Sequence, residues 1–179
     1  MSRQYFADQP YNDAPIADLT AVTATVETGL WNVAQYSPIP ANDARAGKVY
    51  EIFASGIYST GASGTLTLTP RFGTTTGGIT FGASIAQTVP VSLTNEAWYF
   101  HGFMTIRTVG AAGANSTAMF GGGFSGGGAA ATAASSAEVL CGGTSATIDL
   151  SVAGGFFLGW TLSVAGSVTP KQVVWVSRN

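Results

Sequence analysis

The stretch from Gly47 to Gly73 constrains the fold most, because two segments with strand-like alternation flank a loop of small residues. The first arm, residues 48–59, is apolar on both faces, with Val49, Phe53 and Ile57 on one side and Tyr50, Ile52, Ala54 and Tyr58 on the other. The second arm is apolar on one face only, where Leu66, Leu68 and Phe72 alternate with Thr65, Thr67, Thr69 and Arg71. Residues 61–64, of sequence Gly-Ala-Ser-Gly, suit a turn. We therefore predict a long β-hairpin that begins a β-sandwich.

The remainder of the chain repeats this pattern of short alternating runs between turn signals. The runs span residues 20–27, 79–81, 85–91, 97–109, 116–124, 138–141, 144–151, 156–164 and 171–177. About eight to ten strands with this spacing, and no helical pattern, predict an all-β chain folded as an antiparallel β-sandwich. We favour a jelly roll over an immunoglobulin-like sandwich on strand number alone, because the pattern does not specify topology.

The run at residues 97–109 carries aromatic side chains on both faces. Trp98, Phe100, Met104 and Ile106 share one side, and Tyr99, His101, Phe103, Thr105 and Arg107 share the other. This pattern predicts a strand at the centre of a sheet, or one covered by a partner subunit. Asn95 and Glu96 predict a turn before it, and the Gly- and Ala-rich residues 121–136 predict a mobile surface loop.

The chain divides into an extended N-terminal arm, residues 1–18, and a β-sandwich domain, residues 19–179. Pro10 and Pro15 oppose a helix in the arm, which nevertheless carries the aromatic residues Tyr5, Phe6 and Tyr11. One interpretation is an arm that docks these aromatic side chains on a neighbouring subunit. The alternative is a frayed terminus, or an arm that lies across its own domain.

The surface is expected to be weakly charged. Charged residues make up 9% of the 179 residues, against about 25% in a typical soluble domain, and the net charge is −2. Such a surface suits a protein packed in an assembly, and it argues against binding to nucleic acid. The chain shows neither a secretory signal nor an apolar run long enough for a membrane helix, so we expect synthesis in a cytoplasm and no membrane association.

The sequence offers little chemistry, and we predict no enzyme activity, no cofactor and no metal site. Residues 121–126 match G-x-G-x-x-G and residues 123–127 match G-x-S-x-G, but neither lies in the strand–turn–helix context that these motifs require. His101 is the one histidine, and Cys141 is the one cysteine, which we interpret as a small buried apolar residue. Glu51 is expected to form an ion pair at a subunit contact, with an arginine such as Arg107.

Several segments together resemble virion proteins of tailed bacteriophages. They are residues 39–42 (Ile-Pro-Ala-Asn), 47–50 (Gly-Lys-Val-Tyr), 54–60 (Ala-Ser-Gly-Ile-Tyr-Ser-Thr) and 66–68 (Leu-Thr-Leu), followed by the turn at 71–73 and the aromatic run at 98–103. The resemblance covers roughly residues 25–125 and is greatest to capsid decoration (cement) proteins.

This resemblance implies a β-rich homotrimer that binds the major capsid protein on the outer surface of the virion and stabilises the head. It transfers no active site. Tyr5, Phe6 and Tyr11 would anchor the arm on the capsid, because aromatic side chains dominate interface energetics. The face with Tyr99, His101, Phe103 and Arg107 would form the contact between subunits.

A second hypothesis is a carbohydrate-binding β-sandwich on a tail or head fibre that attaches to the host surface. Sugar-binding sites use exposed aromatic rings beside polar groups, and four tryptophans are candidates: Trp31, Trp98, Trp160 and Trp175. The last three lie in alternating apolar runs that are typical of a core. Exposed, coplanar rings of Trp31 and Tyr36 would favour this hypothesis.

Overall fold

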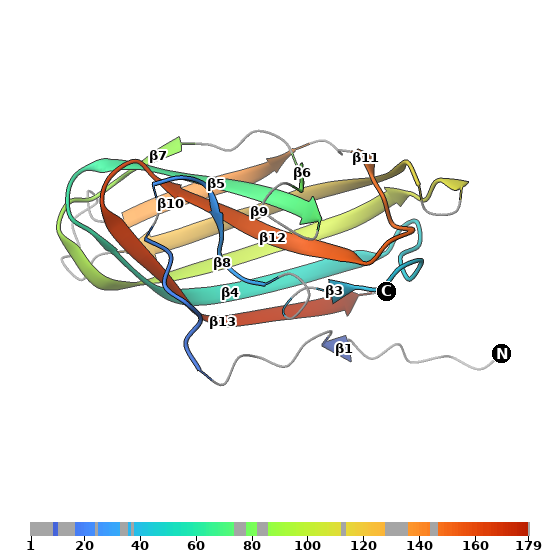
Figure 1. Ribbon diagram of the computed structural model, residues 1–179, viewed down its shortest axis with the longest axis horizontal. Helices are drawn as coiled ribbons and strands as arrows, with labels where there is room; N and C mark the ends of the chain where they lie inside the picture. Colours follow the sequence, from blue (N-terminus) through green and yellow to red (C-terminus); the bar gives the residue numbers. More distant parts are fainter. Residues whose placement is uncertain are drawn as a thin grey trace.

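The computed structural model describes residues 9–10, 17–23, 25–32, 36, 38–73, 78–81, 86–111, 114–127, 136–143 and 147–178. All the named elements in this part of the chain are β-strands, and every pairing between them is antiparallel. They form two sheets that pack face to face (Figure 1), so the predicted all-β sandwich is confirmed. The jelly-roll topology stays a prediction.

The larger sheet contains the longest strands and has the order β1-β13-β4-β8-β9-β10, with β11 paired to β9. Its strands are β1 (Gln9–Pro10), β4 (Val49–Thr60), β8 (Leu93–Thr108), β9 (Ser116–Gly127), β10 (Ser136–Gly143), β11 (Thr147–Ile148) and β13 (Gly166–Arg178). The long strand β8 therefore lies between β4 and β9, as its aromatic residues on both faces predicted.

The smaller sheet lies across the larger one (Figure 1) and has the order β2-β12-β5-β6. Its strands are β2 (Thr28–Gly29), β3 (Pro38–Ile39), β5 (Gly64–Gly73), β6 (Ile79–Thr80), β7 (Ala86–Val89) and β12 (Gly154–Leu162). Two of them lie off the main path, because β3 also pairs with β12 and β7 also pairs with β5. Pro90 follows β7 directly, so the strand ends two residues before the end of the predicted run 85–91.

The predicted hairpin at residues 47–73 is wrong, although both of its strands exist. β4 belongs to the larger sheet and β5 to the smaller one, so the loop at residues 61–63 carries the chain from one sheet to the other. The connection from β12 to β13 crosses in the same way beside it, and the two loops are joined by a hydrogen bond from Gly61 N to Ala165 O (3.1 Å). Alternation predicts a strand and its faces, but not the strand with which it pairs.

The core between the sheets is dominated by aromatic rings. Phe156 of β12 stacks on Phe120 of β9 with 4.5 Å between ring centroids, and it also contacts Phe100 and Trp175. The predicted grouping of residues on one face is confirmed for two strands: Tyr50, Ile52, Ala54 and Tyr58 of β4 and Trp98, Phe100, Met104 and Ile106 of β8 lie in the core. Phe156, Leu158, Trp160 and Leu162 of β12 are buried as well.

The glycine-rich residues 121–127 form a strand instead of the predicted surface loop. They extend β9 and pair with β8 on one side and β10 on the other. Glycine is needed here because the rings of the core occupy the space that side chains would take: a Cβ on Gly126 would lie 2.8 Å from the Phe124 ring and 3.0 Å from the Tyr58 ring. Packing of aromatic rings thus overrides the loop preference of glycine. Residues 128–135 lie outside the described residues.

Two further local predictions are wrong. Residues 20–27 do not form a continuous strand in the part that is described: Val22 makes a single bridge to Val168, and Val26 is 68% exposed. Asn95 and Glu96 lie inside β8 and do not form the predicted turn before it. Asn95 has the positive φ of a turn residue (53°), but it sits beside an irregularity in the register between β4 and β8. A residue suited to turns is used here in a bulge.

Candidate interaction surface

The outer face of the larger sheet brings together the four residues that the sequence singled out for a subunit contact. Tyr99, His101, Phe103 and Arg107 all project from β8 away from the core. Tyr99 and Phe103 are 45% and 42% exposed, which is unusual for aromatic side chains in the middle of a long strand. Their grouping on one face follows from the two-residue period of a strand, whereas their role stays a prediction.

Neighbouring strands extend this apolar surface beyond β8. The register places Phe53 of β4 opposite His101, with Val174 of β13 opposite Phe53. On the other side, exposed Met119 of β9 and Leu140 of β10 continue the same face, and Leu140 is 70% exposed. We call these residues together the outer apolar face; it consists of Phe53, Tyr99, His101, Phe103, Met119, Leu140 and Val174. The members outside β8 were not predicted to belong to a contact surface, although the alternation of β4 placed Phe53 on the correct side.

Glycines lower the surface next to the aromatic residues. Gly121 and Gly123 of β9 lie opposite Phe103 and His101. A Cβ built on Gly121 would meet nothing within 4 Å, so this glycine is not required by packing inside the chain. The outer apolar face therefore has a ridge of rings along β8 and a low strip along β9, a relief that another surface could match.

A buried carboxylate fixes the centre of this face. Glu51 of β4 is 4% exposed; Arg178 Nε of β13 donates a hydrogen bond to it, and Glu51 Oε1 lies 2.7 Å from His101 Nε2. The predicted partner Arg107 is wrong: its guanidinium lies instead against the sulfur of Met119, at 3.6 Å. Phe53 stacks on the His101 ring at 4.3 Å, and Phe103 lies 4.6 Å away on a tilted plane. His101 is thus held rigidly as part of the surface.

The described residues offer no cluster of side chains that is typical of a metal site. They contain no group of three or more His, Cys, Asp or Glu side chains that could hold a metal ion. Burial raises the pKa of Cys141 to about 12, and its 5% exposure agrees with the predicted role as a small buried apolar residue. The two glycine motifs lie in the antiparallel strand β9. No helix among the described residues is long and apolar enough to cross a membrane.

The four tryptophans are buried and present no platform for a sugar. Trp98, Trp160 and Trp175 are 3% exposed or less, and Trp31 donates a hydrogen bond from Nε1 to Phe156 O at 3.1 Å. Trp31 and Tyr36 line a cleft of about 530 Å³ together with residues 19–23 and 28–32, but they are only 6% and 8% exposed. The condition set for the carbohydrate hypothesis is therefore not met.

The predicted anchoring residues Tyr5, Phe6 and Tyr11 lie outside the described residues. The parts of the N-terminal segment that are described, residues 9–10 and 17–22, lie along β13 of the same chain. The role of the arm and its boundary at residue 18 stay predictions.

Comparison with known proteins gives no relative: no family model, no curated protein and no solved structure matches the chain.

Proposed function

We propose that this protein is a structural component of a tailed-bacteriophage virion, a decoration protein that binds the outer surface of the head and stabilises it. The observation that carries the proposal is the outer apolar face, which lies on a long sheet and is exposed in the single chain. Monomeric soluble proteins rarely expose a contiguous apolar patch of this kind, and such patches mark sites of protein association. The resemblance of residues 25–125 to virion proteins supplies the context.

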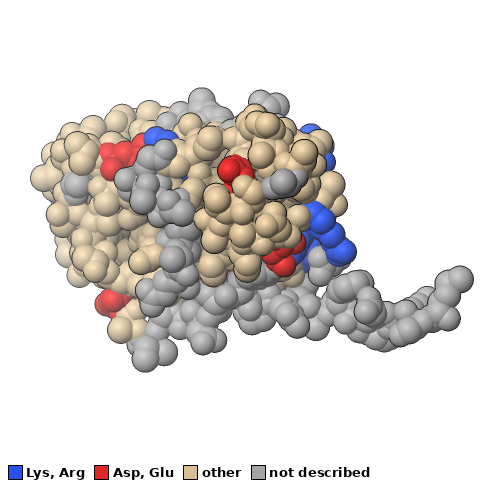
Figure 2. Space-filling view, turned by 45° about the vertical axis from the view of Figure 1, so that its right-hand side comes forward, with Lys and Arg blue, Asp and Glu red and all other residues tan. Residues whose placement is uncertain are grey.

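The charge distribution supports an assembled state. Figure 2 shows the charged residues as small separate groups on a surface made mostly of uncharged residues. A net charge of −2 spread over 179 residues gives little repulsion between copies. Neither feature favours a freely diffusing monomer, whereas both are compatible with a chain that associates with identical copies and with a capsid lattice.

On this proposal the copies associate as a homotrimer through the outer apolar face, and the trimer binds the major capsid protein. Tyr99 and Phe103 supply the rings that bury most area, while Glu51 keeps His101 and Arg178 in place. Each bound copy adds contacts that exist only in the assembled head, and this shifts the equilibrium toward the intact shell. The chain is made in the host cytoplasm and acts on the virion surface without catalysis.

The first test is the native mass by light scattering. The proposal predicts 54.6 kDa for the full-length protein, which is three times the chain mass of 18.2 kDa. The double variant Tyr99→Ser/Phe103→Ser should have the mass of one chain with an unchanged circular dichroism spectrum. Val152→Ser is the matched control, because Val152 is 57% exposed but lies away from the face, and it should remain a trimer.

The second test concerns the head. Heads of the phage that encodes the chain, stripped of this protein, should bind the purified trimer in a sedimentation assay and survive heating to a higher temperature. A wild-type monomer that also fails to sediment with heads would overturn the proposal. A monomer that binds a glycan array instead would favour the carbohydrate hypothesis.

A further inference from the structure

The N-terminal segment covers one edge of the larger sheet. Gln9 and Pro10 pair with Ser177 and Val176 near one end of β13. Near the other end, Val22 and Val168 exchange two backbone hydrogen bonds of 2.8 and 2.9 Å. We call the described residues 9–10 and 17–22 the edge segment; they lie along β13, which would be the edge of the sheet without them.

Few side-chain contacts hold the edge segment in the described part of the chain. Leu19 and Val22 are only partly buried against the core. The ion pair between Asp18 and Lys171, at 2.7 Å, joins two side chains that are 58% and 41% exposed, so water screens it. A cleft of about 530 Å³ is lined by residues 19–23 on one side of the sequence and by residues 28–32 and Tyr36 on the other, so the segment is not fully packed there.

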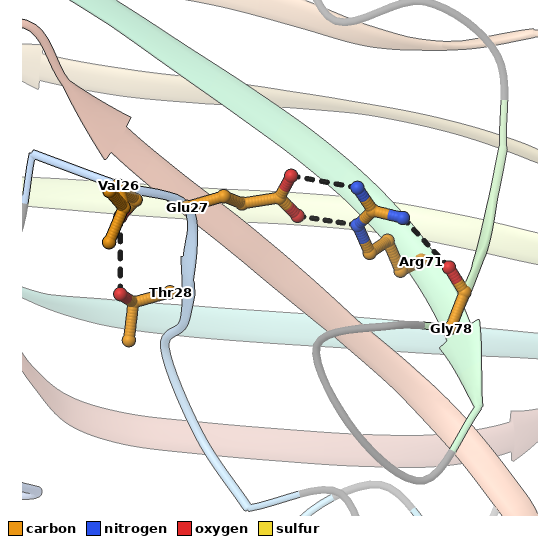
Figure 3. A network of polar contacts seen from close by, with 5 residues as sticks. All are labelled: Val26, Glu27, Thr28, Arg71 and Gly78. Carbon is orange, nitrogen blue, oxygen red and sulfur yellow. Dashed lines mark hydrogen bonds and ion pairs between the residues drawn. The ribbon is translucent and has the colours of Figure 1, made fainter.

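The attachment becomes firm at Glu27. Arg71 of β5 binds both carboxylate oxygens of Glu27, with 2.7 Å between Nη2 and Oε2, and its Nη1 donates to Gly78 O at 2.8 Å (Figure 3). Glu27 also lies against β12, where a Cβ on Gly159 would approach its carboxylate to 2.3 Å. Between this clamp and the bridge at Val22 the chain bends at Thr25 and Val26, both exposed. The chain can change direction there without disturbing the sandwich.

We propose that the edge segment is exchanged between copies, so that residues 9–10 and 17–22 of one chain occupy the β13 edge of another. The occupant is a second copy because this segment is the sequence that fits the register, the hydrogen bonds and the ion pair with Lys171. All these contacts are remade after exchange, and only the connection at residues 23–26 differs. An uncovered β13 would expose unpaired backbone groups, and pairing with a segment of another copy satisfies them as well as pairing within the chain. The inference rests on the self-association in the proposed function.

The test uses a disulfide between two different chains. Gln9 and Ser177 are directly opposite in an antiparallel pair, which sets their Cα atoms within the range that a disulfide spans. One chain carries Gln9→Cys and a second, larger tagged chain carries Ser177→Cys; neither can form this bond alone. The two are co-expressed, purified as the native protein and oxidised. The buried Cys141 is retained. Gln172→Cys replaces Ser177→Cys in the control mixture, because Gln172 lies further along β13 and is not the partner of Gln9.

Exchange predicts a disulfide-linked pair of chains from the first mixture on a non-reducing gel, and none from the control. Random mixing limits the link to about one in four segments of a symmetric oligomer. The single-chain variant Gln9→Cys/Ser177→Cys provides the contrasting case. If it forms only a bond within one chain while the native mass is a trimer, the exchange is wrong and the proposed function stands. If no bond forms in any combination, the β1–β13 register and the exchange are both wrong. A monomeric native mass overturns the exchange, whereas the proposed function is overturned only if that monomer also fails to sediment with heads.

Discussion

The adjacent glycines Gly121 and Gly122 give a direct test of the strand at residues 116–127, because they face opposite sides of the sheet. A Cβ on Gly122 would lie 2.8 Å from Gly102 Cα, 2.8 Å from His101 O and 3.0 Å from the Phe120 ring. Two of these atoms belong to the backbone of β8, which pairs with β9 at this point. They cannot move away as a flexible side chain could, so β8 and β9 must separate to admit even a methyl group.

The expected cost of Gly122→Ala is that of overpacking a well-packed site, about 1–3 kcal/mol of unfolding free energy. For a chain of this size, that lowers Tm by about 2–12 °C. Gly121→Ala is the matched control, because its Cβ would meet nothing within 4 Å. It should leave stability unchanged or raise it by about 0.4–1 kcal/mol, since alanine reduces the entropy of the unfolded chain.

Urea unfolding of both variants and the wild type, with equal m-values, measures the difference. A loop at residues 121–127 would tolerate both substitutions alike. Equal midpoints for Gly121→Ala and Gly122→Ala would therefore refute the assignment of this glycine run to a strand, and with it the low strip on the outer apolar face.

Three further predictions concern buried or clamped groups. Arg71→Ala should lower the unfolding free energy by about 1–3 kcal/mol, because it removes charge-assisted hydrogen bonds at a half-buried site. In a double-mutant cycle with Glu27→Ala, the coupling energy between the two residues should account for much of that loss. Additive effects of the two substitutions would contradict the clamp. Cys141 should resist iodoacetamide at pH 8 in the folded protein and react after unfolding, because burial raises its pKa to about 12; rapid labelling of the native state would show that the site is open. Burial, and to a smaller extent the charge of Glu96, raise the pKa of Tyr58 to about 12. The pKa of Tyr58 is higher in the folded state than the unfolded value near 10. The neutral Tyr58 side chain therefore contributes fully to the unfolding free energy below pH 10, and the unfolding free energy falls by about 2–3 kcal/mol as the pH rises to 12. Tyr58→Phe should unfold with a flatter pH profile in that window, and an unchanged profile would exclude Tyr58 as the titrating group.

The faces of the strands could be predicted from sequence because a two-residue period is a local property. Phe100 and Phe103 were placed on opposite sides of β8 correctly for this reason. The pairing of β4 and β5 could not be predicted in the same way. Their apolar rows face each other across the core, and the same alternation would serve a hairpin within one sheet.

The contact partners of individual side chains were even harder to predict from the sequence. Glu51 lies far in sequence from Arg178 and His101, and they meet because β4 pairs with β13 on one side and β8 on the other. Arg107 is on the same strand as His101, but its side chain reaches Met119 instead. Only the register of the strands decides whether Arg107 or Arg178 lies next to Glu51, and register is a property of the folded sheet. The loop prediction for the glycine run was wrong for a related reason. Glycine is required there because the rings of Phe120 and Phe124 occupy the space that side chains would take.

The two-sided strands connect the fold to the proposed assembly. The sandwich needs only one face of β4 and β8 for its core, and that face is filled by Tyr50, Ile52, Phe100 and Met104. A sheet with a solvated outer face would carry polar residues on the other side. β4 and β8 instead carry Phe53, Tyr99 and Phe103 there, around an imidazole fixed by a buried carboxylate. These rings add nothing to the packing between the sheets and reduce the solubility of a free chain. The proposed burial against identical copies would account for them, and it would account equally for the scarcity of charge that keeps such copies apart.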